Sequence, residues 1–202
     1  MTNDYPPLYV LRHGETAWNA EDRLQGCFDS RLTRIGVAQA EAQHGILARE
    51  DLTGYRALSS PQGRAFQTAA IAVMGHLSGI ETDDRLREIG VGAWAGRLRH
   101  EIGMPSHSGA ASGAIFEHYN RAPGGEGLEA LEIRCRAFLK DLTGPSVLVT
   151  HGVTSRMLRL IVLGLPVREI ATVDGGQGVV FHLENGVQKR LSKGLDAQPR
   201  IG

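Results

Sequence analysis

The sequence has few of the features that mark metal-bound, membrane or nucleic-acid-binding proteins. Its only two cysteines, Cys27 and Cys135, form neither a disulfide framework nor a metal-binding motif. No apolar run approaches the roughly 18 residues of a membrane span. The 22 acidic and 22 basic side chains balance, which argues against a nucleic-acid partner. The first residues lack the basic start and apolar core of a signal peptide, and we expect a cytoplasmic location.

The length and composition are those of a globular protein with one domain. A chain of 202 residues can bury about 70% of its unfolded surface. Its 42% hydrophobic and 22% charged residues are ordinary for a globular domain. The sequence contains no internal repeat and no low-complexity block. We therefore expect a single domain over residues 1–202.

Short apolar runs alternate with stretches of helical periodicity. The strands predicted from these runs cover residues 8–12, 57–59, 146–150, 178–183 and 187–191, the last two forming a hairpin. The predicted helices begin after Thr33, at Ser60-Pro61, at about Leu128 and at about Val153. Strands separated by helices imply an α/β fold: a three-layer αβα sandwich whose central sheet is mostly parallel, with an antiparallel end strand.

One stretch of the sequence lacks this regularity. Residues 90–127 are rich in glycine, serine and histidine, show little periodicity and contain two prolines, Pro105 and Pro123. This pattern predicts a surface excursion or lid over about residues 97–126 rather than a separate domain. We expect its side chains, together with the loop 20–32, to shape a substrate pocket.

Two predicted strands end in the same way. Arg12-His13-Gly14 follows the first apolar run, and His151-Gly152 follows the strand at residues 146–150. Ligands of open α/β sheets bind outside the carboxyl ends of the strands, so the two histidines meet there if these strands are neighbours. The helix after Gly152 would also offer free N–H groups to an anion. The paired motifs therefore predict an anion site containing two histidines.

Arg64 and Glu88 are the further candidates for this site. Arg64 lies early in a helix that follows a strand, which places it at the same edge of the sheet. With Arg12 it could form a guanidinium clamp, because planar guanidinium groups match phosphate oxygens. Glu88 could donate a proton to a leaving oxygen, and Glu15 is a rival candidate for that role.

Together these motifs resemble the histidine phosphatase superfamily, on its phosphoglycerate-mutase-like branch. The similarity runs in the family's order from residue 8 to about residue 153. Its pieces are Leu-Arg-His-Gly-Glu-Thr-Ala-Trp-Asn at 11–19, Arg-Leu-Gln-Gly at 23–26, Ser-Ser-Pro at 59–61 with Arg64 and Gln-Thr-Ala at 67–69, Leu-Arg-Glu-Ile at 86–89, Gly-Ala-Trp-Ala-Gly at 92–96, Pro-Gly-Gly-Glu at 123–126 and Val-Thr-His-Gly at 149–152.

The resemblance implies a role for each matching residue. His13 is the nucleophile that becomes transiently phosphorylated, and His151 is a second catalytic residue beside it. Glu88 is the general acid and later the base. The substrate-binding residues that the resemblance implies are Arg12, Asn19, Gln25, Gly26, Arg64 and Gly152. No metal and no cofactor is expected, because fixed cationic donors can stabilise the transferring phosphoryl group.

The acceptor of the phosphoryl group separates two activities, a phosphatase and a mutase. The chain is short compared with cofactor-dependent mutases, residues 97–126 contain no adjacent arginine pair, and Gln25 stands where such mutases carry a small hydroxyl residue. These features favour water, and hence a metal-independent phosphatase acting on a small phosphate ester. The alternatives are phosphoglycerate-mutase-type transfer and a non-catalytic phospholigand-binding protein. Proteins of this kind are often homodimers, and we expect neither a nucleic-acid nor a membrane partner.

Overall fold

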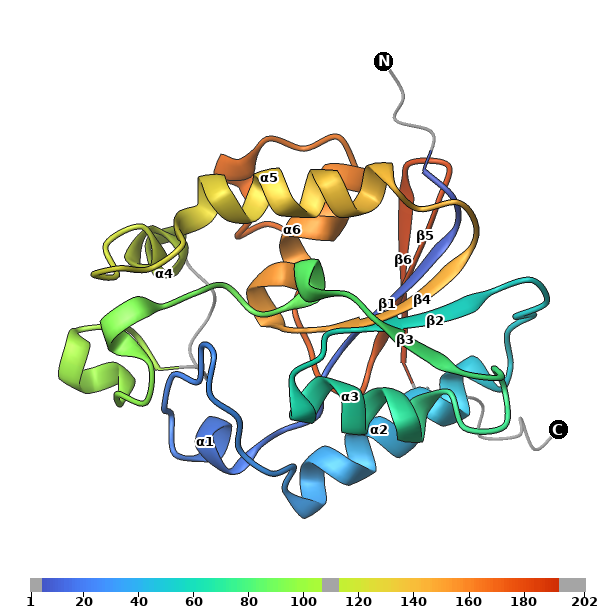
Figure 1. Ribbon diagram of the computed structural model, residues 1–202, viewed down its shortest axis with the longest axis horizontal. Helices are drawn as coiled ribbons and strands as arrows, with labels where there is room; N and C mark the ends of the chain where they lie inside the picture. Colours follow the sequence, from blue (N-terminus) through green and yellow to red (C-terminus); the bar gives the residue numbers. More distant parts are fainter. Residues whose placement is uncertain (1–4, 107–112, 193–202) are drawn as a thin grey trace, which may run out of the picture.

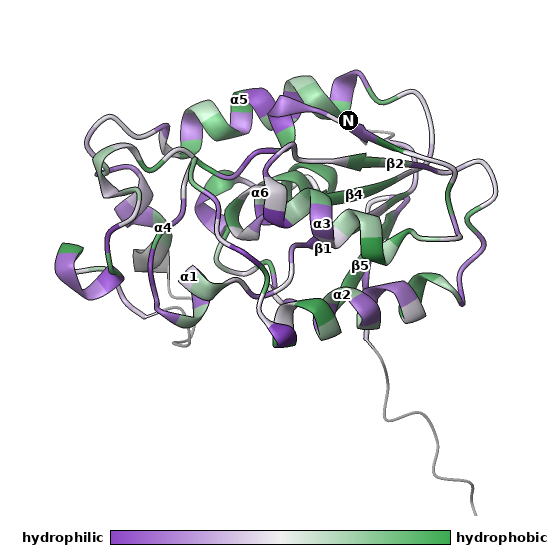
Figure 2. Cartoon of the chain, turned by 60° about the horizontal axis from the view of Figure 1, so that its bottom comes forward, coloured by the Kyte–Doolittle hydropathy of each residue, from purple (hydrophilic) through white to green (hydrophobic). Residues whose placement is uncertain are grey.

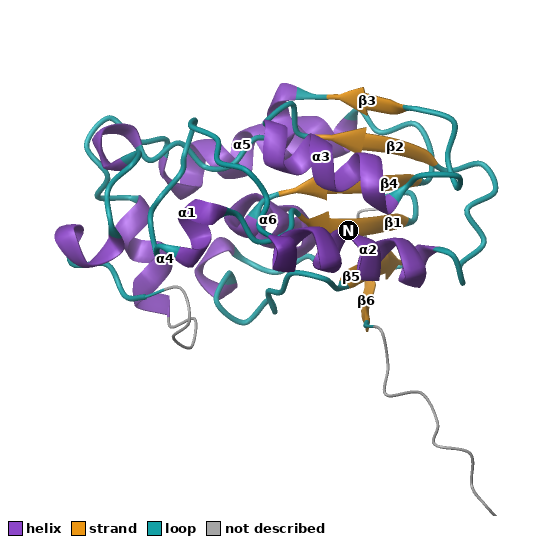
Figure 3. Ribbon diagram, turned by 90° about the horizontal axis from the view of Figure 1, so that it is seen from below, coloured by secondary structure: helices purple, strands orange, loops and turns teal. Residues whose placement is uncertain are grey.

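The parallel strands of the protein converge on one edge of a central sheet. The computed structural model describes residues 5–106 and 113–192, so residues 107–112 of the expected lid lie outside the described residues. The strands are β1 (Leu8–Arg12), β2 (Arg56–Ser59), β3 (Ile80–Thr82), β4 (Ser146–Thr150), β5 (Val180–Glu184) and β6 (Val187–Leu191). They form one six-stranded sheet in the order β3-β2-β4-β1-β5-β6 (Figure 3).

The pairing of the strands divides the sheet into a parallel part and an antiparallel end. β1, β2, β3 and β4 pair in parallel, whereas β5 runs antiparallel to β1 and β6 antiparallel to β5. All residues of β1 and β4 are buried, as expected for central strands covered on both faces. The hairpin between β5 and β6 turns at Asn185-Gly186, both with positive φ. The predicted mostly parallel sheet with an antiparallel end is confirmed.

Helices cover both faces of the sheet. They are α1 (Ala17–Ala20), α2 (Arg34–Leu47), α3 (Gly63–Ala72), α4 (Gly113–Tyr119), α5 (Gly127–Lys140) and α6 (Gly152–Val162). α2 and α3 lie on one side of the sheet and α5 and α6 on the other (Figure 1). Thr33 caps α2 as predicted, because its side chain accepts the N–H of Gly36. No helix in the described ranges is long and apolar enough to cross a membrane.

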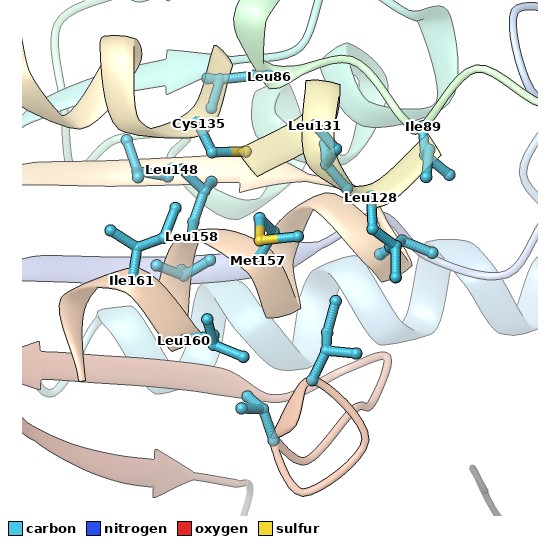
Figure 4. Packing of buried hydrophobic residues seen from close by; sticks show 14 of the residues in the cluster. Leu86, Ile89, Leu128, Leu131, Cys135, Leu148, Met157, Leu158, Leu160 and Ile161 are labelled. Carbon is cyan, nitrogen blue, oxygen red and sulfur yellow. The ribbon is translucent and has the colours of Figure 1, made fainter. Parts of the chain in front are cut away.

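The two faces of the sheet pack into two separate apolar clusters. Leu8 and Val10 of β1 join the cluster beneath α5 and α6, while Tyr9 and Leu11 join the cluster beneath α2 and α3. This division follows from the alternation of side chains along a strand. Figure 4 shows α5 and α6 side chains meeting in the first cluster, and Figure 2 shows hydrophobic residues concentrated along the strands. The buried faces hold the strand ends in fixed positions.

The irregular stretch contains more structure than the sequence predicted. It includes two short 3-10 helices, η2 (Gly92–Trp94) and η3 (Arg99–Ile102), and the helix α4, and a 3-10 helix η1 (Asp84–Leu86) precedes it. A further 3-10 helix, η4 (Val167–Glu169), follows α6. α1 and α4 lie beyond the carboxyl ends of the parallel strands (Figure 3). The excursion therefore stands over the edge of the sheet at which the predicted site residues gather.

Candidate active site

A cavity of about 470 Å³ opens at the carboxyl ends of β1 and β4. Of the residues predicted from the sequence, the ones that line it are Arg12, His13, Asn19, Gln25, Gly26, Arg64, Glu88 and Gly152. His151 is fully buried behind the wall of the cavity and does not line it. Glu15, the rival proton donor, does not line it either, and its carboxylate accepts a hydrogen bond from the Thr33 hydroxyl at 2.7 Å.

His13 stands at the end of β1 with its ring in one defined orientation. Its Nδ1 lies 2.7 Å from the carbonyl oxygen of Gly14. A carbonyl oxygen can only accept, so Nδ1 carries the proton and the lone pair of the neutral ring falls on Nε2. The side chain is 3% exposed, so the ring has little freedom to turn. This arrangement presents an imidazole nitrogen suited to nucleophilic attack.

His151 lies against His13 and is held neutral. The ring centroids are 5.1 Å apart with an interplanar angle of 61°. Nε2 of His151 hydrogen-bonds the Ser60 hydroxyl at 2.8 Å, and Nδ1 has no hydrogen-bond partner among the described residues. Burial, followed by the charges of Arg64 and the neighbouring His13, holds the pKa of His151 well below its ordinary value. The second strand-end histidine therefore supports the site from behind without adding charge.

Arg12 and Arg64 bring two nearly buried guanidinium groups to the cavity. Burial, with Arg156 nearby, lowers the pKa of Arg12 to about 10, so Arg12 remains cationic at neutral pH. Arg64 is 2% exposed and pairs with Asp29 at 2.8 Å. It also donates to the carbonyl oxygens of Phe28 at 2.7 Å and Gly26 at 3.3 Å. Both guanidinium groups are buried, and Arg64 is held in place by its partners, as stabilisation of a charged transition state requires.

The carboxylate of Glu88 sits at the N-terminus of α6. Its oxygens accept the backbone N–H groups of Val153 at 3.3 Å, Thr154 at 3.2 Å and Ile89 at 3.0 Å, and the Thr154 hydroxyl at 3.2 Å. The sequence predicted that this helix end would attract an anion, and the anionic group that meets it in the structure is Glu88. A Cβ atom on Gly152 would lie 3.6 Å from this carboxylate, an ordinary van der Waals distance, so the helix start adjoins the carboxylate directly.

The remaining predicted residues belong to the loop that follows β1. Asn19 forms a capping box with Thr16 at the start of α1. The amide of Gln25 is engaged at both ends, donating to the Thr16 hydroxyl at 2.9 Å and accepting from Ser30 at 3.1 Å. Gly26 has a φ of 54°, a conformation that few other residues adopt. These residues shape the cavity wall through a network that also fixes the loop.

Several lining residues were not singled out as site residues from the sequence. They are Asp22, Arg23, Leu24, Ile89, Val91, Arg99, Phe116, Tyr119, Val153, Arg156, Gly175, Gly176 and Gln177. Arg156 lies one helical turn after Gly152, a spacing that could have placed it at the same helix end. Gln177 donates to the carbonyl oxygen of His13 at 3.1 Å, and no sequence pattern indicated that contact.

The cavity carries an excess of positive charge. Five arginines line it against the two carboxylates Asp22 and Glu88. Arg99 lies 3.5 Å from Asp22, whereas Arg156 makes no ion pair within the described part of the chain. No group of three or more histidine, cysteine, aspartate or glutamate side chains in the described ranges could hold a metal ion. The arrangement suits an anionic ligand and provides a nucleophile beside it.

The sequence is similar to a family of phosphatases and to proteins named as phosphoglycerate mutases. The profile of the histidine phosphatase superfamily (branch 1) matches residues 8–191. The chain is 35% identical over 164 residues to "Probable phosphoglycerate mutase GpmB" of Proteus mirabilis, which covers 79% of this chain and 75% of that protein. The protein of the same name from Salmonella paratyphi C is 37% identical over the same shares of the two chains.

Solved structures share the fold. A mycobacterial glucosyl-3-phosphoglycerate phosphatase in complex with VO3 superposes with a TM-score of 0.75 and 29% identity, covering 89% of this chain and 92% of that one. The alpha-ribazole phosphatase of Shigella flexneri superposes with a TM-score of 0.76 at 23% identity, covering 93% and 96% of the two chains, and supports the fold alone.

Proposed function

The chain belongs to the histidine phosphatase superfamily, and on that premise we propose that it hydrolyses small phosphate monoesters through a phosphohistidine on His13. The observation that carries the proposal is the tautomer of His13. Its Nδ1 donates to the Gly14 carbonyl oxygen at 2.7 Å, which leaves the lone pair on Nε2 in a cavity lined by five arginines.

The first half of the reaction transfers the phosphoryl group to the enzyme. Nε2 of His13 attacks phosphorus, the N–P bond forms and the ester P–O bond breaks. The leaving oxygen takes a proton from Glu88, which must be protonated and turned toward the substrate at this stage. Arg12 and Arg64 stabilise the charge on the equatorial phosphoryl oxygens. His151 stays neutral, because its pKa lies well below the ordinary value.

The second half returns the enzyme to its starting state. Glu88, now a carboxylate, removes a proton from a water molecule, whose oxygen attacks phosphorus as the N–P bond breaks. Inorganic phosphate leaves, and His13 recovers its lone pair on Nε2. Two easier displacements thus replace one difficult one. Because the fixed guanidinium groups supply the positive charge, we propose that the reaction needs no metal ion.

The identity of the acceptor decides between hydrolysis and mutase transfer. Both routes pass through the same phosphohistidine. Residues 97–126 contain no adjacent arginine pair, and the 29% identical mycobacterial structure named above is a phosphatase, which supports water as the acceptor. The names of the curated relatives keep phosphoglycerate mutase as the alternative. Conversion of 3-phosphoglycerate faster than its hydrolysis would select that alternative.

The cavity also favours a substrate with a second acidic group. Arg156 holds its guanidinium group over the ring of Phe116, 5.5 Å from the ring centroid, and donates to the carbonyl oxygens of Val173 and Gly152. Arg99 lies 3.5 Å from the Tyr119 hydroxyl in the same cavity. Arg12 and Arg64 are assigned to the phosphoryl group, so Arg156, together with Arg99 beside its partner Asp22, suits a carboxylate or second phosphate elsewhere on the substrate.

A phosphatase assay with a nucleophile variant tests the proposed function. We expect purified protein to hydrolyse 4-nitrophenyl phosphate equally with and without a chelator. His13→Ala should lower kcat by at least about 10³-fold. His100→Ala is the matched control, because His100 is exposed and does not line the cavity. Phosphohistidine should be detected by mass spectrometry after an alkaline quench in the wild type and in His100→Ala, but not in His13→Ala.

Hydrolysis that survives His13→Ala would exclude His13 as the nucleophile. A chelator-sensitive rate would contradict the metal-free mechanism. The homodimer and the cytoplasmic location expected from the sequence stay predictions.

A further inference from the structure

The segment that carries Glu88 is held in place by side chains of other elements. Residues 87–91 lie between η1 and η2 and belong to no strand or helix. The carbonyl oxygens of Leu86 and Arg87 accept the hydroxyls of Thr150 and Thr154 at 2.6 and 2.7 Å. A segment without a hydrogen-bond ladder of its own depends on such contacts for a fixed position.

Gln62 holds this segment at Glu88 itself. Gln62 is buried at the start of α3, and its Oε1 accepts the backbone N–H of Glu88 at 2.9 Å. Its Nε2 donates to the carbonyl oxygen of Gly26 at 2.7 Å, the same oxygen that Arg64 contacts. The Gln62 side chain therefore connects the backbone of Glu88, the proposed acid, to the loop at Gly26, which Arg64 also contacts.

Glu126 holds the segment on the other side of Glu88. Its backbone N–H donates to the carbonyl oxygen of Gly90 at 2.8 Å, and its carboxylate accepts the N–H of Gly90 at 2.9 Å. Arg134 binds this carboxylate through Nε at 2.5 Å and Nη2 at 3.0 Å. Arg134 also donates to the carbonyl oxygen of Arg85 at 2.6 Å, so the ion pair also contacts η1, just before the segment.

We propose that Gln62 and Glu126 are positioning residues that hold Glu88 where it can protonate the leaving group. Proton transfer in the transition state requires the acid within hydrogen-bond distance of the leaving oxygen. Loss of either side chain removes one of the hydrogen bonds that hold the backbone beside Glu88, and small displacements of a catalytic group are costly. The proposal rests on the role of Glu88 as general acid in the proposed function.

The choice of leaving group separates positioning from mere stabilisation of the fold. 4-Nitrophenolate departs readily as an anion, whereas the alkoxide of an alkyl phosphate such as glycerol 2-phosphate needs a proton. A misplaced acid therefore slows the alkyl ester far more than the aryl ester. A general loss of structure slows both equally. The readout is the ratio of kcat/KM for the alkyl ester to kcat/KM for the aryl ester, because kcat/KM covers the steps up to the phosphohistidine and excludes the later step in which Glu88 acts as base.

Five variants make up the experiment. Glu88→Gln sets the scale, since loss of a general acid costs typically 10² to 10⁴-fold. Gln62→Leu and Glu126→Ala should lower the ratio by about tenfold, with KM little changed. Glu126→Gln keeps an oxygen acceptor for the Gly90 N–H and should retain most of the ratio. Arg85→Gln is the matched control, because Arg85 lies in η1, just before the segment, and its side chain pairs with Asp83 and Asp141 rather than with residues 87–91.

Each outcome supports or overturns the proposal. If Glu88→Gln lowers the ratio but Gln62→Leu and Glu126→Ala leave it unchanged, positioning by these residues is excluded. An unchanged ratio in Glu88→Gln overturns the acid role and this proposal with it, while the His13 test of the proposed function stands apart. If Arg85→Gln lowers the ratio as much as Gln62→Leu, any weakening of the segment suffices and the specific roles are excluded. Circular dichroism identifies a variant that does not fold, and the remaining variants then decide.

Discussion

The buried histidine His151 predicts a pH-dependent stability that can be measured directly. Its side chain is fully buried, and burial, together with Arg64 and His13, holds its pKa well below the ordinary value of 6.5. In the unfolded chain the same ring takes up a proton near pH 6.5. Below that pH the unfolded state therefore binds more protons than the folded state, and the free energy of unfolding must fall as the pH falls.

The magnitude follows from the same linkage. A ring that stays neutral when folded and titrates at 6.5 when unfolded costs about 2 kcal/mol of stability between about pH 7.5 and about pH 5. Other groups also titrate in this range, so the informative quantity is the difference between wild type and variant. His151→Gln removes the titrating ring and keeps an amide that can hydrogen-bond the Ser60 hydroxyl.

Urea unfolding at the two pH values provides the assay. The wild type should lose about 2 kcal/mol more than His151→Gln between them, whatever the variant costs at neutral pH. The exposed His100, changed to Gln, serves as the control and should follow the wild type. Equal losses in wild type and His151→Gln would refute the reasoning, because the ring would then take up its proton as readily in the folded state as in the unfolded chain.

Two further predictions concern the arginines of the cavity. Asp29 accepts the N–H groups of Gly63 and Arg64 and pairs with the Arg64 side chain. Asp29→Ala should therefore lower the free energy of unfolding by about 1–3 kcal/mol and raise the inhibition constant of inorganic phosphate. An unchanged inhibition constant would mean that Asp29 does not orient Arg64. Arg156→Gln should lower kcat/KM about tenfold for 3-phosphoglycerate and little for glycerol 3-phosphate, which lacks the carboxylate. Equal losses on both esters would show that Arg156 does not contact a second acidic group.

The parts of the fold that the sequence predicted are those fixed by burial on two faces. β1 and β4 read as continuous apolar runs because helices cover both of their faces. β3 escaped prediction because it has only three residues and sits at the edge of the sheet, where pairing with β2 rather than an apolar run makes it a strand. α4 lies in a stretch rich in glycine and serine, which local propensity assigns to a loop.

The same distinction applies to the candidate site. His13 and His151 could be placed together from the sequence because neighbouring parallel strands end at one edge of a sheet, and β1 does pair with β4. The contacts of Gln62 and Glu126 with the Glu88 segment could not be predicted. They join residues 26 and 36 positions apart through side chains whose spacing follows no helical or strand period.

Site residues on the ends of strands and helices should respond to substitution differently from site residues on the excursion. His13 stands on a strand end and Arg64 on a helix start, both supported by the buried faces of the sheet. Arg99 and Tyr119 come from the excursion. Tyr119 packs into the apolar cluster beneath α5 and α6, whereas Arg99 belongs to neither apolar cluster. Under the proposed function, phosphoryl transfer depends on residues at the end of β1 and at the start of α3, whereas the choice of substrate depends in part on Arg99, which can be changed without altering either apolar cluster. Glu88 is an intermediate case. Its segment is irregular, but the side chains that hold it lie at the starts of α3 and α5 and in α6. We therefore expect changes in the excursion to alter KM among phosphate esters before they alter the leaving-group dependence of kcat.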